Sequence, residues 1–553
     1  MLKKLLSGLL AGALLLSVAA CSGDTPVSTE EKPADTDTAV HTVEYDFTAC
    51  KVIYGASAGA NASKYAERLK AQLRSKLAAE VEITSDEAAA GAAEILVGDT
   101  NRPESAEVKS RLAGDAKHVY RYELVNGKFV IVANNDDALE TAVQCFIYDV
   151  IKEIRDGKLS LSSDFAYTDS YEVSTELLSN GVQIKTNLIT TIYGATPQKN
   201  QVDLSYARII ELAHNGDYNG VLLATSESLD VGQYLIHRST DFGKTWEKVG
   251  SVNAQMKDMV ANWQPMLYEL PCQVGNLKEG TILLAGCIRN DNTTKTNMVI
   301  YKSNDFGATW KIVSTVDSAD GFSTTGGLSK GLWEPYLMCD DDGKLWCFYS
   351  DEKEAEVHSQ KLVCRYSTDG INWSETQEVV ALEDPNLRPG MITVTKLGDG
   401  RYLAAYEIVG MHDVPIYFKI TDDLNNWNPA DIGTPVATKR GETLGSAPFV
   451  CWTPAGGEKG TILVTANHTA GKTDEESAII LASFNYGESW QVIENPLSFN
   501  AKIDARYSYS PGFFVSQLTG NVFFVNTVAS TTVPGKRNMD LAILEICTYG
   551  GIQ

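Results

Sequence analysis

Histidine and positive charge are both scarce in this sequence. Its 553 residues include 7 His, and 47 Lys and Arg stand against 71 Asp and Glu, which gives a formal net charge of −24. That deficit disfavours binding to nucleic-acid phosphates or anionic lipid headgroups by general electrostatics. The His residues form no HxxxH pair and the 10 Cys form no CxxC pair, so a zinc site of standard spacing is excluded. We therefore predict no metal, no cofactor and no nucleic-acid partner.

Long hydrophobic runs are missing as well. The apolar stretch at residues 5–16 is too short to span a bilayer. It follows Lys3 and Lys4 and leads into Val18-Ala19-Ala20-Cys21, which resembles a bacterial lipobox. The resemblance implies a signal peptide over 1–21 and acylation of Cys21 as the new N-terminus; the alternative is an ordinary secretory signal cut nearby. Polar, acidic residues 22–44 are expected to form a flexible tether. We thus expect an exported protein, lipid-anchored to the bacterial cell membrane or surface.

Aromatic residues and glycine are plentiful instead. There are 24 Tyr, 16 Phe, 9 Trp and 44 Gly, which suits a fold of many short strands joined by turns. Most of the nine cysteines after Cys21 sit in apolar runs such as Trp346-Cys347-Phe348. These cysteines are expected to be buried apolar residues rather than a disulfide framework.

Residues 45–175 alternate between strand and helix patterns. Apolar strand-like runs at 51–54, 81–83 and 93–98, a hairpin over 120–133 and helical patterns at 62–79 and 136–151 predict a small α/β domain. The run from Ala93 to Ile151 resembles the accessory domain that precedes the catalytic domain of β-hexosaminidases. The resemblance implies a domain that packs beside the catalytic one and carries no chemistry.

The rest of the chain is built from a repeat. The pattern S-x-D-x-G-x-T-W occurs at 239–246 and 303–310, with shorter or degraded copies at 367–373, 421–427 and 483–490. The tryptophans that end the copies are separated by 64, 63, 54 and 63 residues, a period that fits four-stranded blades. In the turn, the Asp accepts backbone N–H bonds and the Gly supplies a positive φ. The pattern resembles the Asp-box, or bacterial neuraminidase repeat, which implies a structural role on the face away from the active site.

The repeats predict the architecture. After the fifth copy, strand-like runs at 512–515, 522–525 and 541–544 can form a sixth blade with an N-terminal strand near 182–194. The predicted fold is mainly β: a six-bladed β-propeller over 182–550, preceded by the α/β domain.

Two glutamates are candidates for catalysis. Glu334 lies just before an apolar strand and Glu407 lies inside another, where burial penalises a charge and indicates a partner or a function. The 73 residues between them slightly exceed one repeat, so the two carboxylates can meet across the axis from adjacent blades. Such a pair is the minimum equipment for glycoside hydrolysis.

Other residues at the starts of blades or beside these glutamates suit sugar binding, because arginine bonds hydroxyls and aromatic rings stack on sugars. The predicted substrate-binding residues are Arg208, Trp263, Trp333, Asp351, Arg388, Tyr406 and Tyr509.

Three segments carry a family resemblance. GLWEPYLMCDDDGKLWCFYSDE, RPGMITVTKLGDGRYLAAYE and GSAPFVCWTP resemble blade motifs of glycoside hydrolase family 93, exo-acting α-L-arabinanases on a six-bladed propeller that work with retention. The resemblance covers about 200–530 and implies that Glu334 and Glu407 are the catalytic pair. Sequence leaves their roles open; Glu407, held within a strand, is the preferred nucleophile.

Two alternatives remain at this point. An exo-α-sialidase would use Arg208, Arg388 and Arg506 with Tyr507 or Tyr509. However, the first arginine stands in Ala-Arg-Ile-Ile rather than Arg-Ile-Pro, and the nearest candidate for the blade-one acid is Asp258. A non-catalytic carbohydrate-binding propeller is the other alternative.

Overall fold

The computed structural model describes most of the two predicted domains. The described residues are 42–57, 61–77, 79–112, 118–171, 175–177, 181–194, 204–228, 232–290, 294–321, 330–470, 479–497, 509–529 and 537–548. The expected signal peptide, Cys21 and most of the expected tether lie outside them, as do Arg506 and Tyr507. Among the helices of these residues, none is long and apolar enough to cross a membrane.

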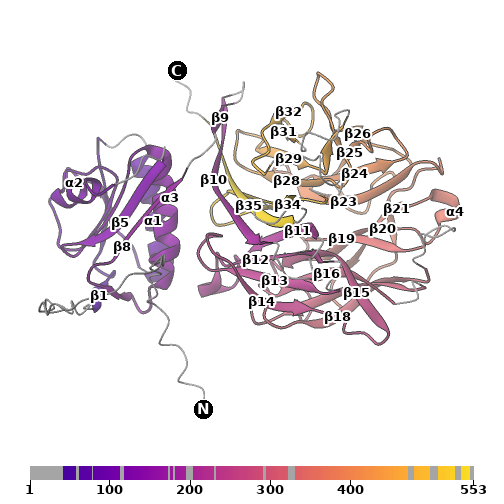
Figure 1. The fold of residues 1–553 in the computed structure, drawn as a ribbon, viewed down its shortest axis with the longest axis horizontal. Helices are drawn as coiled ribbons and strands as arrows, with labels where there is room; N and C mark the ends of the chain where they lie inside the picture. Colours follow the sequence, from indigo (N-terminus) through magenta and orange to yellow (C-terminus); the bar gives the residue numbers. More distant parts are fainter. Residues whose placement is uncertain are drawn as a thin grey trace, which may run out of the picture.

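The N-terminal domain (residues 42–171) is a mixed sheet covered by helices (Figure 1). Its strand order is β3-β2-β4-β6-β5-β8. The elements are β2 (Lys51–Tyr54), α1 (Ala62–Leu77), β3 (Ile83–Ser85), β4 (Glu94–Val97), α2 (Pro103–Lys109), β5 (His118–Val125), β6 (Lys128–Ala133), α3 (Asp136–Asp149), the 3₁₀ turn η1 (Ile151–Glu153) and β8 (Ala166–Tyr171). A separate pair joins β1 (Thr42–Asp46) to β7 (Lys158–Ser162), so residues 42–44 of the expected tether lie in a strand.

Strand β6 explains the layering of this domain. Phe129 and Ile131 pack on the side of α1 and α3, whereas Val130 and Val132 pack on the side of α2 with Val108. Alternating residues of a strand face opposite sides of a sheet, so a strand that is apolar throughout requires cover on both faces.

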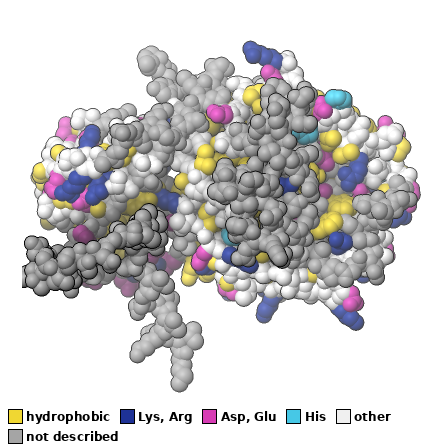
Figure 2. All heavy atoms as spheres, viewed as in Figure 1, with side chains coloured by type: hydrophobic (Ala, Val, Ile, Leu, Met, Phe, Trp, Pro, Cys, Tyr) yellow, Lys and Arg dark blue, Asp and Glu magenta, His cyan; other side chains and the backbone are white. Residues whose placement is uncertain are grey.

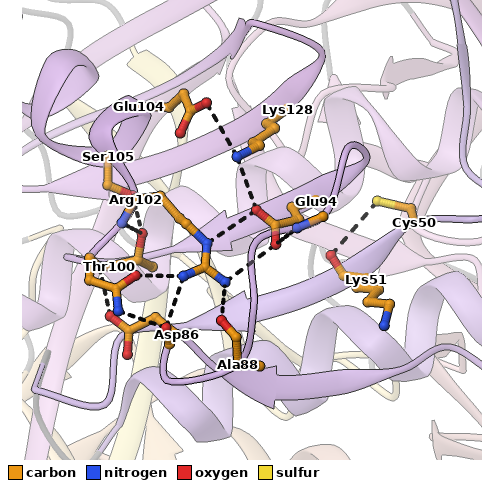
Figure 3. Close-up of polar contacts among 12 residues, drawn as sticks. Cys50, Lys51, Asp86, Ala88, Glu94, Thr100, Arg102, Glu104, Ser105 and Lys128 are labelled. Atoms are coloured by element: carbon orange, nitrogen blue, oxygen red, sulfur yellow. Dashed lines mark hydrogen bonds and ion pairs between the residues drawn. The ribbon is translucent and has the colours of Figure 1, made fainter.

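Four charged side chains are buried together beneath α2 (Figure 3). Glu94 is 0% exposed and accepts contacts from Arg102 at 3.4 Å and Lys128 at 3.2 Å; Lys128 also pairs with Glu104 at 3.2 Å. Burial raises the pKa of Glu94, but the Gly91 N–H, Arg102 and Lys128 outweigh it and hold the pKa below its usual value. We call these four residues the balanced cluster, since it contains two acids and two bases.

The second domain is the predicted six-bladed propeller, which confirms the mainly β fold (Figure 1). Each blade is a four-stranded antiparallel meander, and a fifth strand, β9, adds to blade 6. Blades 1 to 3 are β11 (Leu204–Glu211), β12 (Leu222–Ser228), β13 (Tyr234–Ser239), β14 (Glu247–Val252); β15 (Met259–Glu269), β16 (Ile282–Asn290), β17 (Thr296–Ser303), β18 (Lys311–Ala319); β19 (Leu332–Cys339), β20 (Leu345–Asp351), β21 (Lys361–Ser367), β22 (Gln377–Val380).

Blades 4 to 6 complete the circle. Their strands are β23 (Arg388–Lys396), β24 (Tyr402–Val409), β25 (Ile416–Thr421), β26 (Thr434–Pro435); β28 (Phe449–Thr453), β29 (Thr461–Thr465), β31 (Ile480–Ser483), β32 (Gln491–Ile493); β33 (Gly512–Val515), β34 (Val522–Ala529), β35 (Arg537–Thr548), β10 (Val182–Tyr193) and β9 (Thr175–Leu177). Minor elements are η2 (Gly216–Tyr218), α4 (Ala355–His358), β27 (Leu444–Gly445) and β30 (His468–Thr469). The first strand of the domain, β10, pairs with the last, β35, and this pairing closes the propeller.

The repeated turns join the third and fourth strands of their blades. In the second copy, Asp305 Oδ1 accepts the Thr309 N–H at 2.8 Å, and the Gly307 N–H, at φ 89°, donates to Ser303 Oγ at 3.0 Å. Trp310 donates its indole N–H to Gly307 O at 3.0 Å and is 6% exposed. Because the strands alternate in direction, these turns lie at the opposite face from the starts of the innermost strands.

The first of these turns contacts the N-terminal domain. The Lys244 ammonium lies 4.4 Å from the centre of the Tyr167 ring, donates to its hydroxyl at 3.0 Å and is 3.9 Å from Asp149. Lys76 of α1 adds a 3.0 Å ion pair to Asp217. The two domains are therefore joined at blade 1 by contacts remote from the starts of the innermost strands.

The nine described cysteines form no disulfide with one another, and six of the nine are buried. On the face shown in Figure 2, acidic and basic side chains are interspersed, and the described residues form no continuous basic patch there.

Candidate active site

One position in each blade turns its backbone into the left-handed region at the propeller axis. In or immediately before the innermost strand of each blade, one non-glycine residue has a φ between 50° and 56°. In blades 1 to 4 the pairing with the second strand is interrupted at this point, as in a β-bulge. Such backbone is uncommon for non-glycine residues and gathers at functional sites. The ring consists of Tyr206, Gln264, Glu334, Met391, Ala447 and Ser510.

Three members of this ring form a floor. Tyr206, Met391 and Ala447 pack together as a buried cluster, with Tyr509 against it. Of the two candidate carboxylates, Glu334 lies in the innermost strand of blade 3, and Glu407 lies in the second strand of blade 4, opposite Gly390 near the start of its innermost strand.

Glu334 is held through one oxygen. Its Oε1 accepts the Tyr206 hydroxyl at 3.4 Å and the Gln264 side-chain N–H at 3.2 Å. Its Oε2 is buried and accepts no hydrogen bond of good geometry from the described residues. Burial raises the pKa of Glu334 to about 7, and Glu407 and Glu352 add to the rise against the opposing effect of Arg388 and the nearby Ser350 hydroxyl. A carboxyl with this pKa can carry a proton near neutral pH and release it.

Glu407 lies in β24 and is 4% exposed. Its Oε2 accepts the Ala447 N–H at 2.7 Å and the Ser446 hydroxyl at 3.1 Å. Burial raises its pKa, while these two donors and Arg388 oppose the rise. A side chain on Gly390 would place its Cβ 3.0 Å from Glu407 Oε1, so a larger residue at this position would crowd the carboxylate.

Arg388 faces three carboxylates. It donates from Nε and Nη2 to Glu352 Oε1 at 3.1 and 2.9 Å. Burial lowers its pKa, but Glu352, Glu334 and Glu407 together raise the pKa above its usual value. We call these four residues the acidic cluster, since three acids share one base.

Two indoles form an aromatic wall beside the acids. The rings of Trp263 and Trp333 stack at 5.9 Å with an interplanar angle of 23°, and the Arg289 guanidinium lies 4.6 Å from the Trp263 ring centre. Trp333 donates its indole N–H to Glu352 Oε2 at 2.7 Å, which connects the wall to the acidic cluster. Flat aromatic surfaces beside carboxylates suit a sugar ring.

Most of the residues that the sequence predicted as functional lie at this one place. The structure brings together Glu334, Glu407, Trp263, Trp333, Arg388 and Tyr509.

Three others point elsewhere. Arg208 follows Tyr206 by two residues and donates to Ala207 O, Ser510 O and Ser510 Oγ. It lines a separate axial cavity of about 240 Å³. Tyr406 donates to Ile432 O within the core between blades 3 and 4. Asp351 accepts the Lys353 N–H and pairs with its ammonium. All three bond to protein groups, and their role in substrate binding stays a prediction.

Sequence reasoning missed four polar residues of the site: Gln264, Tyr206, Glu352 and Ser446. A signal was available for the first. Four of the six ring residues precede a proline, in Gln264-Pro265, Glu334-Pro335, Ala447-Pro448 and Ser510-Pro511. A residue followed by proline therefore indicates the positive-φ position at the same point of four blades.

Among the described residues, His, Cys, Asp and Glu form no group of three or more that could hold a metal ion.

No family model matches the sequence, and no curated protein does. Solved structures do. The family 93 α-L-arabinofuranosidase of Fusarium graminearum, in complex with arabinobiose, is 27% identical with a TM-score of 0.55 and covers 64% of this chain and 97% of its own. An α-L-arabinanase of Penicillium chrysogenum, also complexed with arabinobiose, is 29% identical with a TM-score of 0.56 and covers 65% and 98%. The six-bladed propeller thus has structural neighbours among the arabinanases of glycoside hydrolase family 93.

Proposed function

We propose that this protein is an exo-acting, retaining glycoside hydrolase that releases arabinose units from α-1,5-L-arabinan or a related glycan. The observation that carries the proposal is the pair of buried carboxyls, Glu334 and Glu407, which share Arg388 at the propeller axis. The two fungal neighbours, each crystallised with arabinobiose, support arabinan as the substrate class.

The environments of the two glutamates favour different roles. Glu334, with a pKa of about 7 and an Oε2 that accepts no hydrogen bond of good geometry from the described residues, suits the general acid. Glu407 is held by two donors that favour its charged form, which suits the nucleophile. Two titratable carboxyls whose surroundings separate their protonation states are the pattern of an acid and nucleophile pair.

The reaction then proceeds in two steps. Glu334 gives its proton to the glycosidic oxygen while Glu407 attacks the anomeric carbon, so that the leaving sugar departs as an alcohol and a glycosyl ester forms. Glu334, now ionised, takes a proton from water, and the hydroxide oxygen attacks the same carbon and frees Glu407. Two inversions give net retention, and carboxyl groups about 5 Å apart are the geometry that this route requires.

The remaining side chains have supporting roles. Arg388 keeps Glu407 ionised while one proton stays on the acidic cluster, since neighbouring carboxylates do not all ionise together. Trp263 and Trp333 are proposed to stack on sugar rings beside the cleaved bond, and Tyr509 to line the site with Tyr206.

The cellular setting is also a proposal. We infer that Cys21 is lipidated and that the enzyme works outside the cell membrane on an oligosaccharide or polysaccharide. A Cys21→Ser variant would then move from the membrane fraction to the soluble exported fraction; retention of that variant in the membrane fraction would contradict the anchor.

The deciding experiment compares sugars released from linear arabinan and from a sialylated oligosaccharide by the wild type, Glu334→Gln and Glu407→Gln. We expect arabinose from the wild type and a loss of about 10²–10⁴-fold in turnover for each variant. Sialic acid release would instead favour the sialidase, although its first arginine candidate, Arg208, is bonded to protein groups. Binding of arabinan without release of any sugar would favour the non-catalytic propeller.

A further inference from the structure

Gln264 makes two hydrogen bonds to a single residue, the proposed acid. It is the ring residue of blade 2, next to Glu334 in blade 3, and is 6% exposed. Its Oε1 accepts the Glu334 backbone N–H at 3.0 Å, and its Nε2 donates to Glu334 Oε1 at 3.2 Å. Its own backbone N–H donates to Glu227 Oε2 at 2.8 Å. Gln264 is therefore fixed at both ends.

The orientation of this amide follows from an obligate donor. A backbone N–H can only donate, so the amide oxygen of Gln264 must face the Glu334 N–H. The amide NH₂ must then face Glu334 Oε1, and an amide N–H also can only donate. Glu334 Oε1 is thereby constrained to accept, and a proton on that oxygen would oppose the Gln264 N–H.

Tyr206 reinforces the same oxygen. Its hydroxyl lies 3.4 Å from Glu334 Oε1 and 3.4 Å from Gln264 Nε2, so it accepts from the amide and donates to the carboxyl. Oε1 thus faces two donors, whereas the buried Oε2 has no donor of good geometry among the residues that the structure describes. The asymmetry separates the two oxygens of one carboxyl group.

We propose that Gln264 is a positioning residue of the reaction: by holding Glu334 Oε1 as an acceptor, it directs the acid's proton to Oε2, the oxygen for which no described residue provides a donor of good geometry. This inference rests on the proposed role of Glu334 as the general acid. In this proposal the uncharged Gln264 determines which oxygen of Glu334 donates the proton.

The Ser350 hydroxyl lowers the pKa of Glu334, and other charged and titratable groups act on Glu334 from every neighbouring blade. They are Arg388, Arg208, Glu407, Glu352, Tyr206, Tyr509 and Cys287. The Gln264 N–H stabilises the ionised carboxyl, so its removal raises the pKa of Glu334 above about 7. The alkaline limb of kcat/KM must then move to higher pH.

The test uses two substitutions at this position. Gln264→Met keeps the length of the side chain and removes both bonds. We expect about a tenfold lower kcat with little change in KM, because the proton is shared between two oxygens, and an alkaline limb at higher pH. Gln264→Glu keeps the acceptor for the Glu334 N–H but places a second carboxyl against Oε1. It should move the limb further upward, since the two groups must share a proton.

A matched control is present elsewhere in the propeller. Gln255 also has a positive φ, of 51°, and also makes two backbone bonds, donating to Trp310 O at 2.9 Å and accepting from Ile312 N at 3.3 Å. Gln255→Met removes a comparable pair of bonds far from the acids and should leave the limb and kcat unchanged.

The inference is overturned if folded Gln264→Met keeps the wild-type limb and kcat, or if its defect is confined to KM. If that variant does not fold, Tyr206→Phe and Gln264→Glu provide the same readout with smaller changes. If the wild type itself hydrolyses no glycan, the proposed function fails, and the pH dependence of Tm still tests the donor. The difference in Tm between the wild type and Glu334→Gln, measured against pH, reports the titration of Glu334. In Gln264→Met the midpoint of this titration must lie at higher pH; an unchanged midpoint contradicts the inference.

Discussion

The two domains each bury a cluster of charged residues, and the clusters differ in balance. In the N-terminal domain, Glu94 and Glu104 meet Arg102 and Lys128, and the pKa of Glu94 is lowered. At the propeller axis, three glutamates share Arg388, and the pKa of Glu334 is raised to about 7. Burial acts on both. Two acids paired with two bases make the first cluster a stabilising ion-pair network. The second cluster has three acids and one base, so one of its carboxyls can hold a proton that is available for catalysis.

Breaking the balanced cluster should cause the largest loss of stability. Glu94→Gln leaves Arg102 and Lys128 buried with one acid, and the loss of one partner in a buried charge network costs about 3–5 kcal/mol. We expect this from chemical denaturation of the N-terminal domain, with kcat on arabinan unchanged in the folded fraction. Because the pKa of Glu94 is lowered in the folded state, its contribution is present above the usual pKa and is lost as the pH falls through the folded value. The surface variant Glu80→Gln is the control. Equal stability of the two variants would contradict a stabilising role for the balanced cluster.

The corresponding Glu→Gln substitution in the acidic cluster, Glu334→Gln, should raise the free energy of unfolding rather than lower it. The folded pKa of Glu334, about 7, lies above its usual 4.5, so the contribution of this group to stability is greatest below pH 4.5 and is lost as the pH rises through 7. Glu334→Gln removes that loss and should gain up to about 3 kcal/mol at pH 8 and nothing at pH 4. Thermal unfolding at the two pH values measures it. A pH-independent difference would show that Glu334 does not titrate in this range.

Removing the single base should make the acidic cluster still less balanced. The Arg388 charge opposes the raised pKa of both Glu334 and Glu407, so Arg388→Met should move the alkaline limb of kcat/KM upward by about one pH unit. Arg401→Met, which breaks a surface pair with Asp399, is the matched control and should leave the profile in place. A downward shift in Arg388→Met would contradict the role given to this charge.

Charges at the surface turns should matter least. Asp305 accepts two bonds from Thr309 in the second repeated turn, and Asp305→Ala should cost about 1 kcal/mol without a change in kcat. Exposed Asp342 provides the control substitution. A Tm unchanged by Asp305→Ala, or a loss of activity without loss of stability, would show that the turn has another role.

Particular residues show how far the sequence could lead. The spacing of Trp246, Trp310 and the later tryptophans predicts the blades, because a turn and its indole are local features. Glu334 and Glu407 could be found because an acid in an apolar strand is itself a chemical signal. In the N-terminal domain, the helix starting at Ala62 and the strand at Lys51 begin where expected. Helix α2 is not among the predicted elements, because its one buried apolar residue, Val108, gives no helical period.

The rest depended on long-range geometry. A bulge beside Tyr206 and the following residue interrupts the register, so Arg208 faces the far cavity, and an inserted residue reverses the facing of all that follow. Tyr406 alternates with Glu407 along one strand and points to the core for that reason. Gln264 carries no charge, and its importance arises only when blade 3 places Glu334 against it.

The pairing of β10 with β35 has a consequence for the order of folding. Blade 6 combines β10, from the start of the propeller, with its last three strands, so nearly the whole chain must be present before the circle can close. Until then the edges of β10 and of the latest blade stand unpaired, and such edges invite association between chains. The N-terminal domain precedes β10 in the chain and can fold first. It can then contact blade 1 through Lys244 and Tyr167 before the last strand pairs with β10.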